Sequence, residues 1–347
     1  METKKKGFPA AFWVCACTEI FERLAYYLGR SLILIFVTAS VATGGLGLSD
    51  TVAANMQSNL TAFSYLLPLF GAVIVDKYIG ARYTTPVGMF IAAAGYFTGG
   101  IAKSSAGVYA MIFLVSLGLA LFKNGAIIGR VITDKSQMDP AFSMRYTLVN
   151  VGAFIGTFLV GILYKDVFAK DGVLGFAPCF KMAALMMVLG GLWYIFVCWR
   201  FLGDLGKLPF KKTLTEEEKA AEAKKKEETG TKQPLTTIEK KRIGAIFVAS
   251  LFSIVFWIFW YLGYMPVYFY WAENMDWVVA GYQVPSTWFD AANSLFCVIL
   301  GPVTAALWKK LAARPQGDMS LFRKTGLGIA IIGVGYLFYA AIDIMRG

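Results

Sequence analysis

The chain has 347 residues, of which 57% are hydrophobic and only 16% are charged, and its mean hydropathy is +0.59. This composition is typical of membrane proteins, because a soluble enzyme of this length would carry far more charge. The sequence contains no histidine. Imidazole therefore can neither bind a metal nor relay protons, and catalytic arrangements that need histidine are excluded.

The formal net charge of +11 alone would suggest nucleic acid binding, but the positions of the basic residues along the chain argue against it. Apolar windows of roughly 20 residues, the length that crosses a bilayer, recur along the whole chain. Most of the lysines and arginines between these windows fall on one side of the alternating spans, so the positive-inside rule predicts a cytoplasmic N-terminus and no affinity for nucleic acid. We predict nine spans, near residues 10–38, 54–75, 84–102, 107–132, 144–164, 178–201, 243–271, 288–308 and 325–344.

The first span carries charges inside an apolar run. Glu19, Glu22 and Arg23 lie near its middle, and Tyr26, Tyr27 and Arg30 continue the stripe at spacings of three and four, which places all six on one helix face. Such a face must contact protein or water, because ionisable groups inside a membrane are costly and mark functional sites. The alternative is an internal ion pair between Glu19 and Arg23 that only joins this helix to a neighbour.

Polar residues also occur in or beside the second and fourth spans. Asp76, Lys77 and Arg82 lie between spans two and three, where they form either a gate or an ordinary surface ion pair. Lys123 lies within the fourth span and needs a carboxylate partner, for which we expect Glu19 or Glu22, unless it snorkels to the cytoplasmic edge.

Three further polar side chains lie inside spans. Tyr65, Asn150 and Asn293 belong to spans two, five and eight, and each either lines a site or joins helices through hydrogen bonds.

A long polar interval predicts the domain organisation. We expect an N-terminal six-helix bundle at 8–202, a charged cytoplasmic linker at 203–242 and a partial C-terminal bundle of three helices at 243–346. Charged sequence of this kind forms solvated linkers.

Several segments resemble motifs of one transporter family. Glu19 to Tyr27 reads EIFERLAYY and resembles the ExxERFxYY motif in the first helix of proton-dependent oligopeptide transporters, a branch of the major facilitator superfamily. LFKN at Leu121 to Asn124 resembles the family's LFKPN segment in helix four, and YTLVNVG at Tyr146 to Gly152 resembles its fifth-helix signature. DKYIGAR at Asp76 to Arg82 resembles the superfamily's loop between helices two and three.

The resemblance implies an all-α polytopic membrane protein with the major facilitator superfamily fold, in which nine transmembrane helices, six plus three, leave the C-terminal half incomplete. It implies proton-coupled symport of di- and tripeptides by alternating access. Proton coupling would involve Glu19, Glu22, Arg23 and Lys123, and gating would involve Asp76, Lys77 and Arg82. Substrate binding would involve Arg23, Tyr26, Tyr27, Arg30, Tyr65, Lys123, Asn150, Trp257 and Asn293.

The seventh span departs from the family pattern. The family usually shows FWxxxEQ, whereas this chain has FWIFWYL at Phe256 to Leu262, so Tyr261 stands where an acid is expected. Coupling would then depend on Glu19 and Glu22. The absence of the family's last three helices, together with Tyr261, keeps open a truncated family member that does not transport. A second alternative is a transporter of another small anion such as nitrate or an amino acid, because two cations in a cavity do not demand a peptide.

The expected partners are small peptides, protons and the lipid bilayer, and we expect a monomer. The protein should be a multi-pass protein of the plasma or inner membrane. No cofactor or metal is expected, because the five cysteines lack metal-ligand spacing. We also expect no enzymatic activity, since the sequence offers no phosphate-cradling glycine loop and no activated nucleophile.

Overall fold

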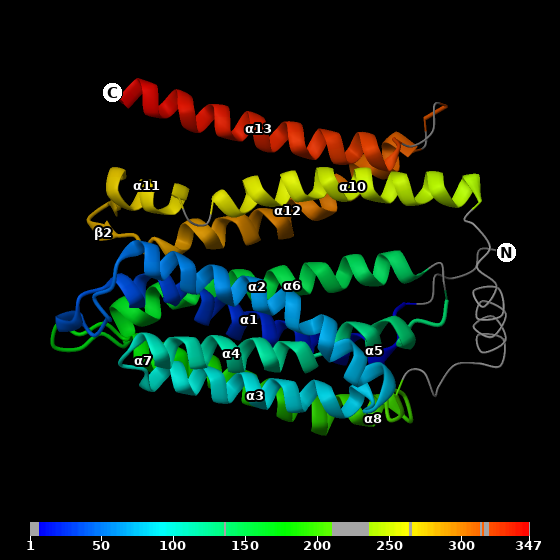
Figure 1. The fold of residues 1–347 in the computed structure, drawn as a ribbon, viewed down its shortest axis with the longest axis horizontal. Helices are drawn as coiled ribbons and strands as arrows, with labels where there is room; N and C mark the ends of the chain where they lie inside the picture. Colours follow the sequence, from blue (N-terminus) through cyan, green and yellow to red (C-terminus); the bar gives the residue numbers. More distant parts are fainter. Residues whose placement is uncertain are drawn as a thin grey trace. The chain divides into compact units, whose positions relative to one another are not determined.

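The computed structural model describes residues 7–134, 137–209, 236–263, 266–312, 314–315 and 319–346, and nearly all of them are helical (Figure 1). The chain divides into two compact units. The first holds the described residues of Met1–Leu214 and Trp277–Gly301, and the second holds those of Thr215–Asp276 and Pro302–Gly347. Residues 210–235, most of the predicted linker, lie outside the described residues.

Helices of the first unit coincide with the first six predicted spans. We had expected the fourth span to be one continuous helix, but the helix stops at Leu121. Phe122 has an extended backbone, and the N–H of Lys123 donates to Thr85 Oγ1 at 3.4 Å. The elements are α1 (Ala10–Thr38), η1 (Val41–Thr43), α2 (Asp50–Lys77), α3 (Ala81–Ile101), α4 (Ser105–Leu121), α5 (Asn124–Val131), α6 (Met138–Ile162), η3 (Leu163–Val167), α7 (Phe176–Trp193), η4 (Tyr194–Cys198) and α8 (Trp199–Leu202).

The remaining predicted spans correspond to α10 (Thr237–Leu262), α12 (Thr287–Ala312) and α13 (Leu321–Arg346). The seventh span was placed too late at 243–271, since α10 begins directly after Thr236. This threonine and Glu239 form a capping box, which satisfies backbone N–H groups at the start of the helix. A separate helix, α11 (Pro266–Asn274), follows. Within the second unit, α10 packs on α13, where the Tyr336 hydroxyl donates to the Phe259 carbonyl at 2.6 Å.

Six helices of the described residues are long and apolar enough to cross a membrane. The other long helices include α1, which does not meet this criterion because it carries Glu19, Glu22, Arg23 and Arg30. The protein is therefore a multi-pass membrane protein with one strongly polar helix. The six apolar segments are Asp50–Lys77, Ser105–Val131, Pro140–Val167, Phe176–Leu202, Thr237–Leu262 and Phe322–Met345.

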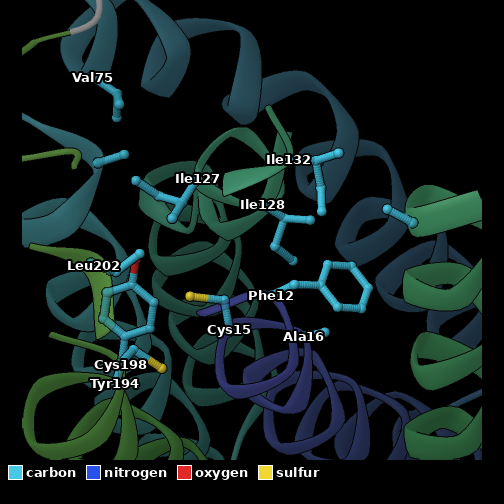
Figure 2. Close-up of a cluster of buried hydrophobic side chains, with 12 residues drawn as sticks. Phe12, Cys15, Ala16, Val75, Ile127, Ile128, Ile132, Tyr194, Cys198 and Leu202 are labelled. Atoms are coloured by element: carbon cyan, nitrogen blue, oxygen red, sulfur yellow. The ribbon is translucent and has the colours of Figure 1, made fainter. Parts of the chain in front are cut away.

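Helix α1 packs against α2, α5, α6 and α7 in the first unit. Its N-terminal turns contribute to a hydrophobic cluster in which Phe12 and Cys15 meet Ile128 of α5, and Tyr194 and Cys198 of η4 (Figure 2). These five residues are fully buried. The cluster fixes the start of α1, and the charged residues follow directly on the next turns.

A short hairpin, β1 (Val278–Val279) and β2 (Tyr282–Gln283), belongs to the first unit. Its turn residues Ala280 and Gly281 both have positive φ, as a type I′ turn requires. The Tyr282 hydroxyl donates to Asp166 at 2.8 Å, and this hydrogen bond raises the pKa of Tyr282 above its ordinary value. Trp288 stacks on Phe158 at a centroid distance of 4.6 Å. The hairpin and the start of α12 are thus joined to α6 and η3.

Candidate functional site

The polar stripe of α1 is buried within the first unit. Glu22 is fully buried, and Glu19, Arg30 and Tyr26 are at most 6% exposed. A buried carboxylate is tolerated only when a cation and further hydrogen bonds accompany it. The partners of the two acids therefore define the site.

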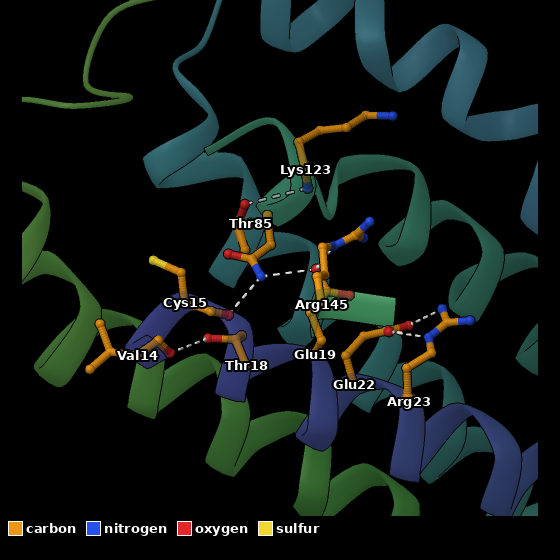
Figure 3. A network of polar contacts seen from close by, with 10 residues as sticks. Val14, Cys15, Thr18, Glu19, Glu22, Arg23, Thr85, Lys123 and Arg145 are labelled. Atoms are coloured by element: carbon orange, nitrogen blue, oxygen red, sulfur yellow. Dashed lines mark hydrogen bonds and ion pairs between the residues drawn. The ribbon is translucent and has the colours of Figure 1, made fainter. Parts of the chain in front are cut away.

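Glu22 pairs with its neighbour Arg23. The guanidinium donates from Nε and Nη2 to the two carboxylate oxygens of Glu22, a bidentate ion pair (Figure 3). Its carbon Cζ also lies 4.7 Å from the centre of the Tyr26 ring, a cation–π contact, and Tyr26 meets Tyr27 edge to face. The pair considered from the sequence, Glu19 with Arg23, is not formed because both Nε and Nη2 of Arg23 are directed at Glu22.

Glu19 is held by two other helices. Its Oε1 accepts from Arg145 Nε of α6 at 3.0 Å and from Asn124 Nδ2 of α5 at 3.0 Å, and the same amide donates to the Cys15 carbonyl at 2.8 Å (Figure 3). Sequence reasoning missed both partners. The position of Arg145 inside the apolar segment Pro140–Val167 was a signal of an intramembrane ion pair.

Lys123 does not contact the acids of α1, contrary to expectation. Its Nζ donates to the carbonyl of Pro68 in α2 at 2.9 Å, and Asp76 stabilises its charge electrostatically. Figure 3 shows the side chain extending away from Glu19 and Glu22. The physical reason is the break between α4 and α5, which directs Lys123 toward α2.

The start of α3, directly after the connection from α2, is hydrogen-bonded to α8 and to the residues that follow α8. Arg82 is 8% exposed, donates to the carbonyls of Gly203 and Trp199, the latter at 3.0 Å, and lies over the Trp199 ring. The backbone N–H of Arg82 also donates to Gly206 at 3.0 Å. In place of the surface ion pair with Asp76 that the sequence allowed, Arg82 contacts backbone carbonyls. Lys77 is exposed.

The other predicted residues are distributed over several helices. Arg30 lies over the Tyr27 ring at 5.8 Å, and the Asn150 amide donates within α6 to the Tyr146 carbonyl at 2.9 Å. Tyr65 of α2 is 67% exposed. The structure thus brings together the α1 residues and adds Arg145 and Asn124, whereas Asn293 of α12 is exposed and Trp257 belongs to the second unit.

The described residues contain no group of three acidic or cysteine side chains that could hold a metal ion. A helical membrane bundle with compensated ion pairs on its first helix is instead the arrangement of a transporter, in which charged groups inside the membrane contact substrates or ions.

Comparison with known proteins agrees with this class. The model of the POT family matches residues 203–347. The chain is 23% identical to the di-/tripeptide transporter of Lactococcus lactis subsp. cremoris, over 98% of this chain and 77% of that protein. It is also 23% identical to the uncharacterized transporter YclF of Bacillus subtilis, over 95% of this chain and 73% of that protein.

A solved POT family transporter in complex with a thioalcohol-conjugated peptide superimposes with a TM-score of 0.82 at 22% identity, covering 97% of this chain and 77% of that structure. The fold is therefore that of the POT transporters. The resemblance of the chain to the POT family, expected from the sequence, is confirmed by these matches.

Proposed function

We propose that this protein is a proton-coupled symporter of di- and tripeptides that works by alternating access. The observation that carries the proposal is the bidentate pair of a fully buried Glu22 with a partly exposed Arg23 in a POT fold. The names of the relatives support the substrate class, because a transporter of Lactococcus lactis is described as acting on di- and tripeptides.

The pair suggests how coupling works. Arrival of a proton on Glu22 removes the negative charge that holds Arg23, which frees the guanidinium for the carboxylate of a peptide. Tyr26 and Tyr27 lie beside it and offer hydroxyls for the peptide backbone. Since the charge state of Glu22 changes the contacts of α1, the proton shifts the population of conformations.

Further residues of the first and second units belong to the substrate cavity and to the gate. Arg30, Tyr65, Asn150, Trp257 and Asn293 contribute to the substrate cavity. Asp76, Lys77 and Arg82 belong to the cytoplasmic gate. We assign Lys123 to this gate rather than to the acids of α1, because its ammonium donates to the Pro68 carbonyl of α2. The protein acts as a monomer without enzymatic activity, as two bundles at 8–202 and 243–346 joined by a linker, in the plasma or inner membrane with its N-terminus in the cytoplasm.

The test is uptake of a labelled dipeptide into proteoliposomes, with and without an inward proton gradient. We expect gradient-driven uptake by the wild type and none by Arg23→Ala, while Lys103→Ala, which removes an exposed charge between α3 and α4, transports normally. Competition by unlabelled dipeptide but not by nitrate or a free amino acid would support the peptide assignment. Folded protein without uptake would instead support a non-transporting relative.

A further inference from the structure

Arg145 reaches from α6 to α1 and is anchored at one edge only. Its Nε donates to Glu19 Oε1 at 3.0 Å, where the Glu19 side chain is 2% exposed and the Arg145 side chain is 30% exposed. One side of the guanidinium is therefore fixed on a buried carboxylate, while the other reaches the surface of the first unit.

The terminal nitrogens of Arg145 remain available. Among the residues that the structure describes, no hydrogen-bond partner is found for its Nη1 and Nη2, although a guanidinium offers five N–H donors. Gly125 leaves room for this group, since an ideal Cβ there would lie 3.1 Å from both Cζ and Nη2 of Arg145. The side chain is thus a positioned cation with unused donors, which suits planar recognition of a carboxylate.

Arg23, like Arg145, binds a buried glutamate of α1 and is itself partly exposed. Two of its nitrogens bind Glu22, its side chain is 25% exposed, and both Arg23 and Arg145 act electrostatically on Glu22. Figure 3 shows both arginines beside the acids of α1. Two acids balance two guanidiniums, so a proton on either acid leaves one positive charge uncompensated. A site of this composition attracts an anion when it is protonated.

We propose that Arg145 is a substrate-binding residue, the second cation that receives the carboxylate of the substrate together with Arg23. The inference rests on the proposed symport of peptides at this site. It gives Arg145 the role expected of Lys123, whose ammonium is directed at the Pro68 carbonyl. The substrate class is then a peptide with a free carboxyl group, and an amidated peptide lacks the recognised group.

The experiment compares binding of a dipeptide with binding of the same dipeptide amidated at its C-terminus, by competition against a labelled dipeptide. Arg145→Gln is expected to weaken binding of the free acid by about 10- to 100-fold, the range of hydrogen bonds to charged groups, and to leave the amide unchanged. Lys103→Gln removes an exposed charge elsewhere and should leave the affinities for both ligands as in the wild type.

Four outcomes would each overturn a claim. An equal loss for acid and amide would show that Arg145 only positions Glu19, and wild-type affinity for the acid would show that it has no role in binding. Absence of dipeptide binding by the folded wild type would overturn the proposed function itself. If Arg145→Gln does not fold, Glu19→Gln combined with Arg145→Gln removes the buried pair together. That double variant should also lose the preference for the free acid, and retention of the preference overturns the inference.

Discussion

Gly156 of α6 lies against the backbone of Leu24 in α1, where an ideal Cβ on the glycine would be 2.5 Å from the Leu24 carbonyl oxygen. One turn earlier, Gly152 faces the Ile20 carbonyl, at 2.8 Å from its own ideal Cβ. This GxxxG spacing lets two membrane helices approach closely. Arg145 lies on the same face of α6 two turns before Gly152, so the close approach also brings its guanidinium to Glu19.

A side chain at Gly156 should therefore loosen the contact of α6 with α1. Gly156→Ala is expected to lower the free energy of unfolding by about 1–3 kcal/mol, the usual cost of overpacking. Gly328→Ala is the matched control, because nothing lies within 4 Å of its ideal Cβ, and it should be neutral or slightly stabilising. Thermal unfolding in detergent measures both, and equal midpoints for the two variants would contradict the packing described.

The partners of the α1 acids predict which substitutions are coupled. Glu19→Gln and Arg145→Gln should show an interaction free energy of about 0.5–3 kcal/mol in a double-mutant cycle, because they share a hydrogen bond. Glu22→Gln and Lys123→Gln should be additive within about 0.5 kcal/mol, since Lys123 is directed at α2. Denaturant unfolding of the four single and two double variants decides the matter. An interaction free energy between Lys123 and Glu22 would contradict the structure and support the ion pair expected from the sequence.

Arg82 should matter for stability in a way that Lys77 does not. Arg82→Lys loses the fork that reaches two carbonyls and the contact with the Trp199 ring, so we expect a loss of about 1.5–3 kcal/mol. Lys77→Ala changes an exposed side chain and should stay within about 0.5 kcal/mol. The thermal midpoints of both variants check this expectation. It is wrong if Arg82→Lys unfolds at the wild-type temperature.

Glu22→Gln should separate proton coupling from binding. The amide cannot take up a proton, so gradient-driven uptake should be lost, while exchange of labelled for unlabelled dipeptide without a gradient should continue. Both modes are measured in the same proteoliposomes. Glu273→Gln, which changes an exposed acid of α11, is the control and should retain both. Gradient-driven uptake by Glu22→Gln would show that another group carries the proton.

Much of the fold could be predicted because the signals are local. Apolar runs of bilayer length locate most of the long helices of the described residues, and the charges of α1 mark it as the polar helix. The capping box at Thr236 and Glu239 was also readable, although the span was predicted to begin later. The break at Phe122 was not predicted, although Lys123 and the turn-favouring dipeptide Asn124-Gly125 follow it directly, because the apolar run continues beyond them.

The sequence by itself determined that this is a helical membrane protein with two acids and an arginine on one face of its first helix, because hydropathy and helical periodicity depend only on neighbouring residues. Only the tertiary structure decided which cation meets which acid. Arg145 is 126 positions from Glu19, and it reaches that residue because two glycines bring α6 onto α1. Lys123 turns away because its helix is interrupted. Such pairings depend on the distance and rotation between helices, which are set by packing rather than by sequence spacing.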